Sequence, residues 1–313
     1  MLKKVLVVGG AGYIGGSVTD ILADKKIPFT VYDNLTYENH YLKPVDFIFG
    51  DVRDRKKLKQ ILFNYSHVVW LAAIVGDGAC AINPQLTKGV NQEAVKFISS
   101  HYDGRIIFTS TCSVYGKSEF PVAESSKTSP LSVYAKTKLE AEKYLKGKDS
   151  LIFRLGTAYG ISDTYSRIRM DLAINYMTMN AVKNSKLTVY GGKQCRPFIH
   201  VRDIGRIIVD NLNAQNKGIY NLACFNISIL DLAKLIKKET GCEITITKEF
   251  FEDRRNYNAV IAKGLKDGVF TDKTFYTIPF GIREIKELTE SNRVKNLEIE
   301  LYSNEKYLLQ TLK

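Results

Sequence analysis

Two side chains four residues apart, those of Tyr134 and Lys138, could together move a proton to or from a substrate oxygen. They stand near the start of a predicted helix that runs to about Leu145, and their spacing puts them on one face, one turn apart. An ammonium group beside a phenol favours the phenolate and lowers the tyrosine pKa from about 10. A tyrosine tuned in this way can take a proton from a sugar hydroxyl or return one to a ketone.

A hydroxyl group upstream could orient the same substrate oxygen. Thr111 stands at the end of the segment 105–110, which reads as a strand. On their own, a tyrosine and a lysine at this spacing are equally well a solvated pair on a surface helix. Together with a hydroxyl at a strand end and a site for a redox cofactor, the pair becomes specific and predicts proton transfer coupled to oxidation of an alcohol.

Three spaced glycines near the start of the chain indicate the redox cofactor. An apolar strand leads directly into Gly9, Gly12 and Gly15, and a helical pattern follows. Strand, turn and helix open a dinucleotide-binding βαβ unit, whose glycines allow a tight turn and a close approach to a pyrophosphate. The helix N-terminus, which includes Tyr13 and Ile14, then offers its N–H groups to the phosphates. By itself, the motif could also be an ordinary glycine-rich turn.

An acid after the second apolar segment indicates which dinucleotide binds. Asp33 ends the segment 29–32, near the spacing of about 20 residues after the glycines that is typical of a ribose-binding carboxylate. A carboxylate there accepts hydrogen bonds from the ribose hydroxyls and would repel a 2′-phosphate. The next residues, Asn34 and Leu35, include no arginine that could hold such a phosphate. We therefore expect NAD rather than NADP.

Two further strand ends are expected to contact the cofactor. The segment 46–52 reads as a third strand ending in Asp51, whose carboxylate could meet the adenine ring together with the backbone of Val52. Asp51 could equally cap the charged helix that follows, and one residue can do both. The next strand, 68–73, is buried and should pass under the cofactor at its last residues, which are Leu71, Ala72 and Ala73.

Alternating strand-like and helix-like segments predict an α/β fold with a doubly wound, parallel Rossmann sheet, whose ligands bind outside the carboxyl ends of the strands. After about residue 217 the pattern changes and predicts a smaller C-terminal α/β lobe. The end of the chain, from about Ser291, is charged and weakly patterned, and no role is predicted for it. We expect residues 1–160 and 186–225 to form the NAD-binding domain and residues 161–185 and 226–313 to form the substrate-binding lobe.

The composition is that of an ordinary globular protein with a basic balance. The 313 residues carry a formal net charge of +12 and are 45% hydrophobic. Because the lysines are spread along the chain, the charge favours a phosphorylated small molecule over nucleic acid or a membrane as partner. The longest apolar stretch, 68–75, is too short to span a bilayer. The five cysteines, an odd number without metal-ligand spacing, favour a cytoplasmic location and no metal site.

These motifs resemble the extended short-chain dehydrogenases/reductases of the nucleotide-sugar epimerase/dehydratase family, through nearly the whole chain. The glycine turn and the ribose acid fit the NAD site of that family, and Thr111, Tyr134 and Lys138 fit its catalytic triad. In the 4,6-dehydratases of the family an acid pair follows the catalytic threonine. Here Cys112 and Ser113 stand in its place, which argues against elimination of water.

The resemblance also implies a nucleotide-diphosphate sugar as the substrate. Arg196 falls on the arginine of the substrate-side segment of the family, and Arg255 falls on its diphosphate-binding arginine. Guanidinium groups suit a diphosphate because they are planar and permanently charged, although any one of them could instead form a surface salt bridge. The full set of expected substrate-binding residues is Thr111, Cys112, Arg169, Asn175, Arg196 and Arg255.

The resemblance implies oxidation at C4 of a nucleotide-linked hexose or heptose. Tyr134, assisted by Lys138, takes the proton of the C4 hydroxyl, and the C4 hydride passes to NAD to give a 4-keto sugar. If the keto sugar turns and takes the hydride back, the enzyme is a 4-epimerase; if it leaves, the enzyme is a 4-dehydrogenase. The nucleotide, whether GDP, UDP or dTDP, remains open.

The resemblance further implies an enzyme of surface-polysaccharide sugar biosynthesis that forms a homodimer or a higher homo-oligomer. A different class, a non-catalytic NAD-binding sensor or an RNA-associated member of the same fold, is the alternative, since a fold does not fix a function. The intact set of Thr111, Tyr134 and Lys138 argues against it, because a sensor has no need of a proton relay.

Overall fold

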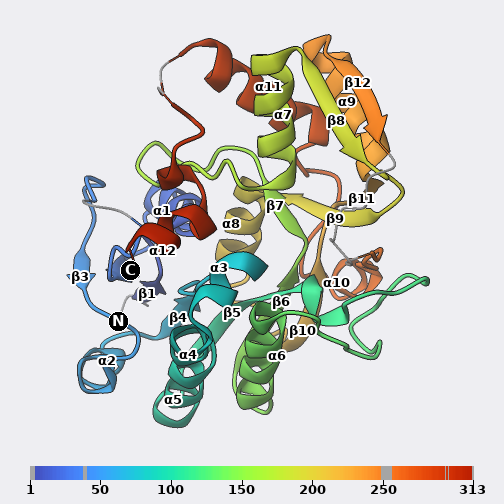
Figure 1. The fold of residues 1–313 in the computed structure, drawn as a ribbon. Helices are drawn as coiled ribbons and strands as arrows, with labels where there is room; N and C mark the ends of the chain where they lie inside the picture. Colours follow the sequence, from blue (N-terminus) through green and yellow to red (C-terminus); the bar gives the residue numbers. More distant parts are fainter. Residues whose placement is uncertain (1–3, 38–40, 248–255, 293, 295, 312–313) are drawn as a thin grey trace.

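A seven-stranded parallel sheet forms the centre of the protein, in the order β10-β6-β5-β4-β1-β2-β3 (Figure 1). The computed structural model describes residues 4–37, 41–247, 256–292, 294 and 296–311. The strands of this sheet are β1 (Val5–Val8), β2 (Phe29–Asp33), β3 (Phe47–Phe49), β4 (His67–Trp70), β5 (Arg105–Thr111), β6 (Ser150–Leu155) and β10 (Gly218–Leu222). The predicted α/β class with a doubly wound parallel sheet is confirmed.

Helices cover both faces of the sheet, which explains why its central strands are apolar along their whole length. One face packs against α1 (Tyr13–Asp24), α8 (Val201–Asp210) and the short α10 (Ala262–Lys266). The other packs against α2 (Arg55–Leu62), α5 (Ala94–His101) and α6 (Val133–Leu145). The strand order reverses between β1 and β4, and a sheet of this kind binds its ligand at such a point.

The helix that follows the loop after β4 is broken rather than continuous. It consists of α3 (Asp77–Ile82), α4 (Pro84–Lys88), the π-helical turn η1 (Gly89–Glu93) and α5. Asn91 in the π turn accepts a hydrogen bond from the backbone N–H of Ile74 at 2.8 Å and donates one to its carbonyl at 2.9 Å. The irregular turn therefore holds the loop that leaves β4 beside the cofactor site.

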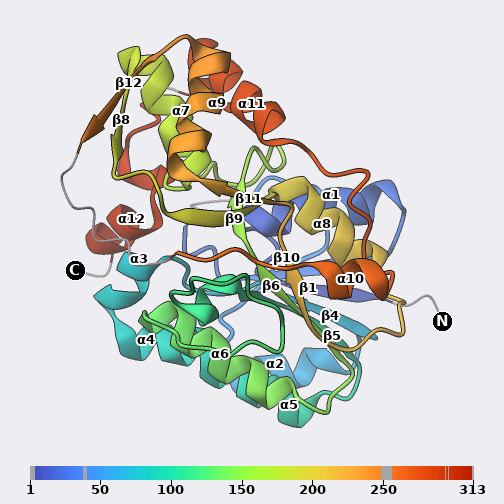
Figure 2. The same ribbon diagram turned by 90° about the vertical axis from the view of Figure 1, so that its right-hand side faces the viewer.

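A smaller lobe stands on the carboxyl ends of the strands (Figure 2). Its apolar core joins α7 (Ala173–Asn184), α9 (Ile229–Thr240) and α11 (Ile278–Glu290). Ser228 caps α9, and Gly241 ends it in the left-handed conformation, with φ of 75°. The lobe and its junction with the sheet domain contain the remaining strands: β7 (Thr157–Tyr159), β8 (Lys186–Tyr190), β9 (Cys195–His200), β11 (Phe225–Ser228) and β12 (Glu243–Thr247).

One segment lies elsewhere than expected. Residues 186–190, which the expected division gave to the NAD-binding domain, form β8, and β8 pairs in parallel with β12 and packs against α7 and α9. The reason is that Leu187 and Val189 alternate with exposed residues and bury their side chains in the core of the lobe. The remaining boundaries of the two parts stay a prediction. Across the described part of the chain, no helix is both long and apolar enough to cross a membrane.

Candidate active site

A cavity of about 1690 Å³ lies between the sheet and the lobe, at the carboxyl ends of the strands. Pockets for a single small molecule measure about 300–1,000 Å³, so this cavity has room for two ligands. The glycine turn, Thr111, Tyr134 and Arg196 all line it. The predicted residues of the cofactor and catalytic sites therefore share one space, while Lys138 is buried and does not line it.

The glycine turn is shaped by close backbone contacts. Gly9 has φ of +84°, and a Cβ atom added to it would lie 2.5 Å from the backbone nitrogen of Ala72. A Cβ atom on Gly15 would lie 2.5 Å from the carbonyl oxygens of Gly9 and Gly10. Gly12 precedes α1 without a side-chain cap, so the N-terminus of this helix faces the cavity with the positive end of its dipole. This is a cradle for a pyrophosphate.

The ribose acid is prepared by the turn itself. The Asp33 carboxylate accepts hydrogen bonds from the backbone N–H groups of Ala11 at 3.1 Å and Leu35 at 2.8 Å. Burial nevertheless raises the pKa of Asp33 above its ordinary value, because few solvent molecules reach the carboxylate. Asp33 lines the cavity, where ribose hydroxyl donors would relieve this cost.

The other predicted cofactor contacts also line the cavity. The Asp51 carboxylate is held by Arg53, with Nε–O and Nη2–O distances of 2.9 and 2.7 Å, and accepts a hydrogen bond from Asn34. The Arg53 hydrogen bonds keep the pKa of Asp51 below its usual value, so this acid stays charged. The lining further includes the predicted residues Tyr13, Ile14, Leu35, Val52, Leu71, Ala72 and Ala73.

The cradle therefore fits a dinucleotide with an unphosphorylated ribose. The fit rests on the close backbone approach at Gly9 and Gly15 and on the buried carboxylate of Asp33. When bound, NAD accepts a hydride from the substrate and brings a positive charge on its nicotinamide ring.

The catalytic side chains are positioned by a strand end and a helix start. Thr111 is the last residue of β5, and its hydroxyl accepts a hydrogen bond from the Ser113 N–H at 3.1 Å. Tyr134 lies in the first turn of α6, whose N-cap is Ser132. The Thr111 hydroxyl lies close enough to the Tyr134 phenol to lower its pKa, against the larger effect of burial. Both side chains line the same cavity, and their predicted roles at the substrate oxygen stay a prediction.

The pKa of Tyr134 is raised in the protein alone, whereas the sequence led us to expect a lowered one. Burial is the largest cause, and the carboxylate of Asp77 adds to it. Burial also lowers the pKa of Lys138 to about 7. The Lys138 ammonium lies 4.3 Å from the centre of the Phe108 ring, a cation–π distance. Desolvation therefore dominates the pKa of both groups in the protein alone.

A buried ion pair lies next to Lys138 on α6. Glu142, one turn further along α6, pairs with Arg154 of β6 at 2.7 Å, and both side chains are less than 5% exposed. Glu142 also accepts a hydrogen bond from Ser110 and attracts the Lys138 ammonium. These interactions of Glu142 thus hold in place the face of α6 that carries Tyr134 and Lys138.

The predicted substrate-binding residues divide into two groups. Arg196 and Arg169 line the cavity; Arg169 is paired with Asp171, with an Nε–O distance of 2.6 Å. Cys112 and Asn175 do not line it. The buried Cys112 thiol donates to the Arg154 carbonyl, and the buried Asn175 amide is hydrogen-bonded to backbone groups of residues 160 and 169. Arg255 lies outside the described residues.

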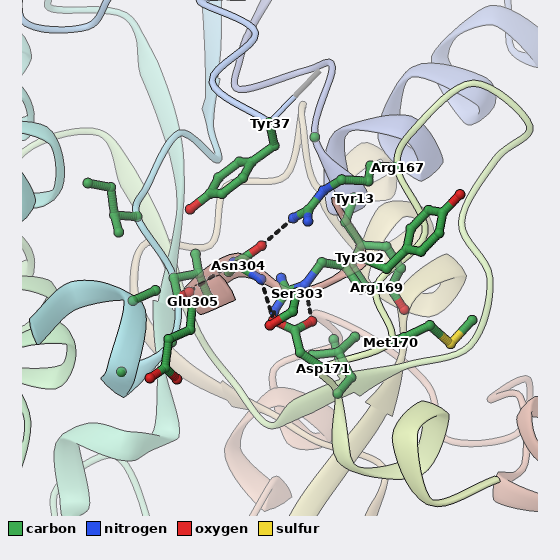
Figure 3. Close-up of a pocket in the computed structure, with 18 of the residues that line it drawn as sticks. Tyr13, Tyr37, Arg167, Arg169, Met170, Asp171, Tyr302, Ser303, Asn304 and Glu305 are labelled. Atoms are coloured by element: carbon green, nitrogen blue, oxygen red, sulfur yellow. Dashed lines mark hydrogen bonds and ion pairs between the residues drawn. The ribbon is translucent and has the colours of Figure 1, made fainter. Parts of the chain in front are cut away.

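Several side chains on the cavity were missed from the sequence (Figure 3). Tyr37 stands two residues beyond the ribose motif, and Arg167 two residues before Arg169, so proximity to predicted residues could have suggested both. Asp77 begins α3 and lines the cavity close enough to Tyr134 to affect its pKa. Asn304 comes from the weakly patterned end of the chain, where no local signal pointed to it.

Comparison with known proteins gives the family. Residues 5–223 match the model of the NAD dependent epimerase/dehydratase family. A putative UDP-glucose 4-epimerase of Methanocaldococcus jannaschii is 27% identical over 253 residues, which cover 76% of this chain and 82% of the relative. Solved structures share the fold as well, and two of them are complexes with UDP-glucose.

The first is UDP-glucose 4-epimerase of Thermotoga maritima with UDP-glucose, at a TM-score of 0.79 and 20% identity, covering 92% of this chain and 99% of the other. The second is MoeE5 in complex with UDP-glucose and NAD, at a TM-score of 0.77 and 23% identity, covering 93% and 100%. Three observations point to the same family and the same cofactor: the glycine cradle, the ribose acid and the match of residues 5–223 to the family model. This protein belongs to the NAD-dependent epimerase/dehydratase family and uses NAD as its cofactor.

Proposed function

We propose that this protein is an NAD-dependent 4-epimerase of a UDP-linked hexose. The observation that carries the proposal is that Thr111 and Tyr134 lie close together and line the same cavity as the NAD cradle and Arg196. The relative from Methanocaldococcus jannaschii is named as a putative UDP-glucose 4-epimerase, which favours UDP over GDP or dTDP and epimerisation over release of the keto sugar.

The proton transfer falls to Tyr134 and its neighbours. The Tyr134 phenolate takes the proton of the C4 hydroxyl and becomes the phenol, while the Thr111 hydroxyl holds the substrate oxygen beside it. Because burial raises the pKa of Tyr134 in the protein alone, the phenolate needs nearby positive charge, which Lys138 and the cofactor supply together. With a pKa of about 7, the Lys138 amine can gain or lose a proton at neutral pH. It can therefore accept a proton from, or return one to, the groups beside it on this helix face.

Epimerisation requires that both faces of C4 meet the cofactor in turn, so the keto sugar has to turn over while the nucleotide stays anchored. A volume of about 1690 Å³ has room for the cofactor and a nucleotide sugar together. Arg196, which lines the cavity from β9, is suited to anchor the diphosphate during this turn. Neither Cys112 nor Ser113, the residues after Thr111, carries a carboxylate for eliminating water.

The proposal is tested by Tyr134→Phe with UDP-glucose as substrate. Removing this one hydroxyl should lower the rate at which the C4 epimer forms by roughly a factor of a hundred or more. The amount of NAD bound to the protein should stay unchanged. Tyr144→Phe is the matched control, because Tyr144 lies on the same helix but does not line the cavity. The control should keep full activity. Undiminished turnover in Tyr134→Phe would refute the role of this tyrosine.

A further inference from the structure

The end of the chain folds back over the cofactor cavity. Residues 297–311 include the short turn η3 (Glu300–Tyr302) and the helix α12 (Asn304–Thr311), and lie beyond the part that matches the family model. In both ribbon views α12 lies beside α3, between the lobe and the sheet domain (Figures 1 and 2). We call residues 297–311 the C-terminal strap. Ten of its fifteen residues line the cavity, namely Leu297, Glu298, Ile299, Tyr302, Ser303, Asn304, Glu305, Lys306, Leu308 and Thr311.

Asn304 ties the strap to both sides of the cavity (Figure 3). Its amide donates to the Val75 carbonyl of the loop after β4 at 2.9 Å, and its backbone N–H donates to the Asp171 carboxylate at 2.9 Å. Its side-chain oxygen accepts a hydrogen bond from Arg167, which also donates to the Leu301 carbonyl of the strap. Asn304 is only 3% exposed, so all these bonds are shielded from water.

Apolar contacts continue the same closure. Leu308 is buried against Ile74 and Cys80, in a cluster to which Tyr134 also belongs. The Tyr307 ring packs on the Tyr37 ring with centroids 5.6 Å apart, and the guanidinium of Arg167 lies 4.5 Å from the centre of the Tyr37 ring. The strap therefore shares an apolar cluster with the catalytic tyrosine and contacts the loop beyond the ribose acid.

The loop that carries Arg167 is itself anchored over the cofactor helix. Lys43 pairs with the fully buried carboxylate of Asp163 at 2.9 Å and donates to the Gly16 carbonyl of α1 at 3.1 Å. A Cβ atom on Gly16 would lie 2.2 Å from the Asp163 carboxylate, which shows how closely loop and helix approach. The strap thus rests on a support that is fixed to the cradle.

These contacts share one property. The loop beyond Asp33, the loop after β4 and the loop over α1 each border the NAD cradle, and the strap joins all three. We propose that the C-terminal strap closes the cavity over the dinucleotide and retains NAD through repeated turnovers, with Asn304 as the positioning residue that holds it shut. This inference rests on NAD binding and not on which sugar reacts. It deepens the proposed function, because a retained cofactor must return its hydride to the sugar in the same cavity.

The test measures release of NAD rather than activity. NAD-loaded wild-type protein, Asn304→Ala and the control Gln310→Ala are diluted into buffer with an enzyme that destroys free NAD, and the NAD left on the protein is followed over time. Gln310 is exposed on the same helix and does not line the cavity. Asn304→Ala should release NAD roughly tenfold faster or more, which corresponds to about 1.4 kcal/mol. Equal release rates for Asn304→Ala and Gln310→Ala would overturn the proposal.

A second measurement uses the wild-type chain, in case Asn304→Ala folds poorly. Hydrogen exchange of the α12 amides should slow when NAD is added, because a strap that closes over a ligand opens less often in its presence. The amides of α10, which does not line the cavity, serve as the internal control. Exchange of α12 that does not respond to NAD would overturn the proposal. Failure of the proposed function would look different, as normal retention of NAD without any C4 epimer.

Discussion

The burial of Lys138 makes a prediction about stability that is separate from catalysis. Its side chain is 2% exposed, and burial lowers the pKa of its ammonium from 10.5 to about 7 against the attraction of Glu142. The unfolded chain protonates this lysine more readily than the folded protein does. Wherever the unfolded chain carries the proton, Lys138 therefore lowers the stability of the folded state. Lys138→Met keeps the length of the side chain and removes the charge. We expect this variant to be inactive and, without NAD, more stable than the wild type.

The size of this stability difference and its dependence on pH follow from the linkage between proton binding and folding. Between about pH 7 and 10.5 the unfolded wild type binds one proton that the folded protein does not, so wild-type stability rises with pH across this window. Below about pH 7 both states are protonated and the cost of burying the charge is complete, at most about 5 kcal/mol for a shift of this size. The advantage of Lys138→Met should therefore be largest near pH 6 and fall by roughly 2 to 3 kcal/mol by pH 9.

The assay is urea unfolding of NAD-free protein at a series of pH values. Lys136→Met is the matched control, because Lys136 is exposed on the same helix and its charge is already solvated. This control should differ little from the wild type at any pH. A Lys138→Met variant that is less stable than the wild type at pH 6, or whose difference from it does not depend on pH, would refute the reasoning from burial.

Two further predictions concern the cofactor site and its support. Asp33→Ala removes the acceptor for the ribose hydroxyls. Because hydrogen bonds to a charged group contribute about 1.5–3 kcal/mol, this variant should bind NAD roughly tenfold to a hundredfold more weakly in a fluorescence titration. An unchanged affinity for NAD would contradict the role of Asp33. Arg154→Leu leaves Glu142 buried and unpaired and should lower the free energy of unfolding by about 3–5 kcal/mol in urea. A loss below about 1 kcal/mol would show that this pair does not support α6.

The sequence predicted those parts of the protein that depend on local patterns. The apolar strand, glycine turn and helix start identified the NAD cradle, and a spacing of four put Tyr134 and Lys138 on one face of α6. The parallel sheet followed from alternating segments with short connections. In each case the residues that make the contact lie close together in the chain, or belong to a strand whose position in the sheet follows from the repeated βα pattern.

The rest depends on contacts that local patterns do not encode. The bond from Asn304 to Val75 joins residues 229 positions apart, in a segment without clear periodicity. Cys112 and Asn175 were expected at the substrate, but their side chains are buried away from the cavity, a detail of side-chain direction that spacing does not reveal. The raised pKa of Tyr134 arises from burial by several distant elements, so the sequence indicated only the opposing effect of its lysine neighbour.

The most direct test of the proposed function follows one hydrogen atom. UDP-glucose carrying deuterium at C4 is incubated with the NAD-loaded protein in ordinary water, and the product is examined by NMR and mass spectrometry. An epimerase that retains its cofactor predicts the C4 epimer with unchanged mass and with deuterium still at C4. A released keto sugar with reduced cofactor, or a product that has lost water, would contradict the account.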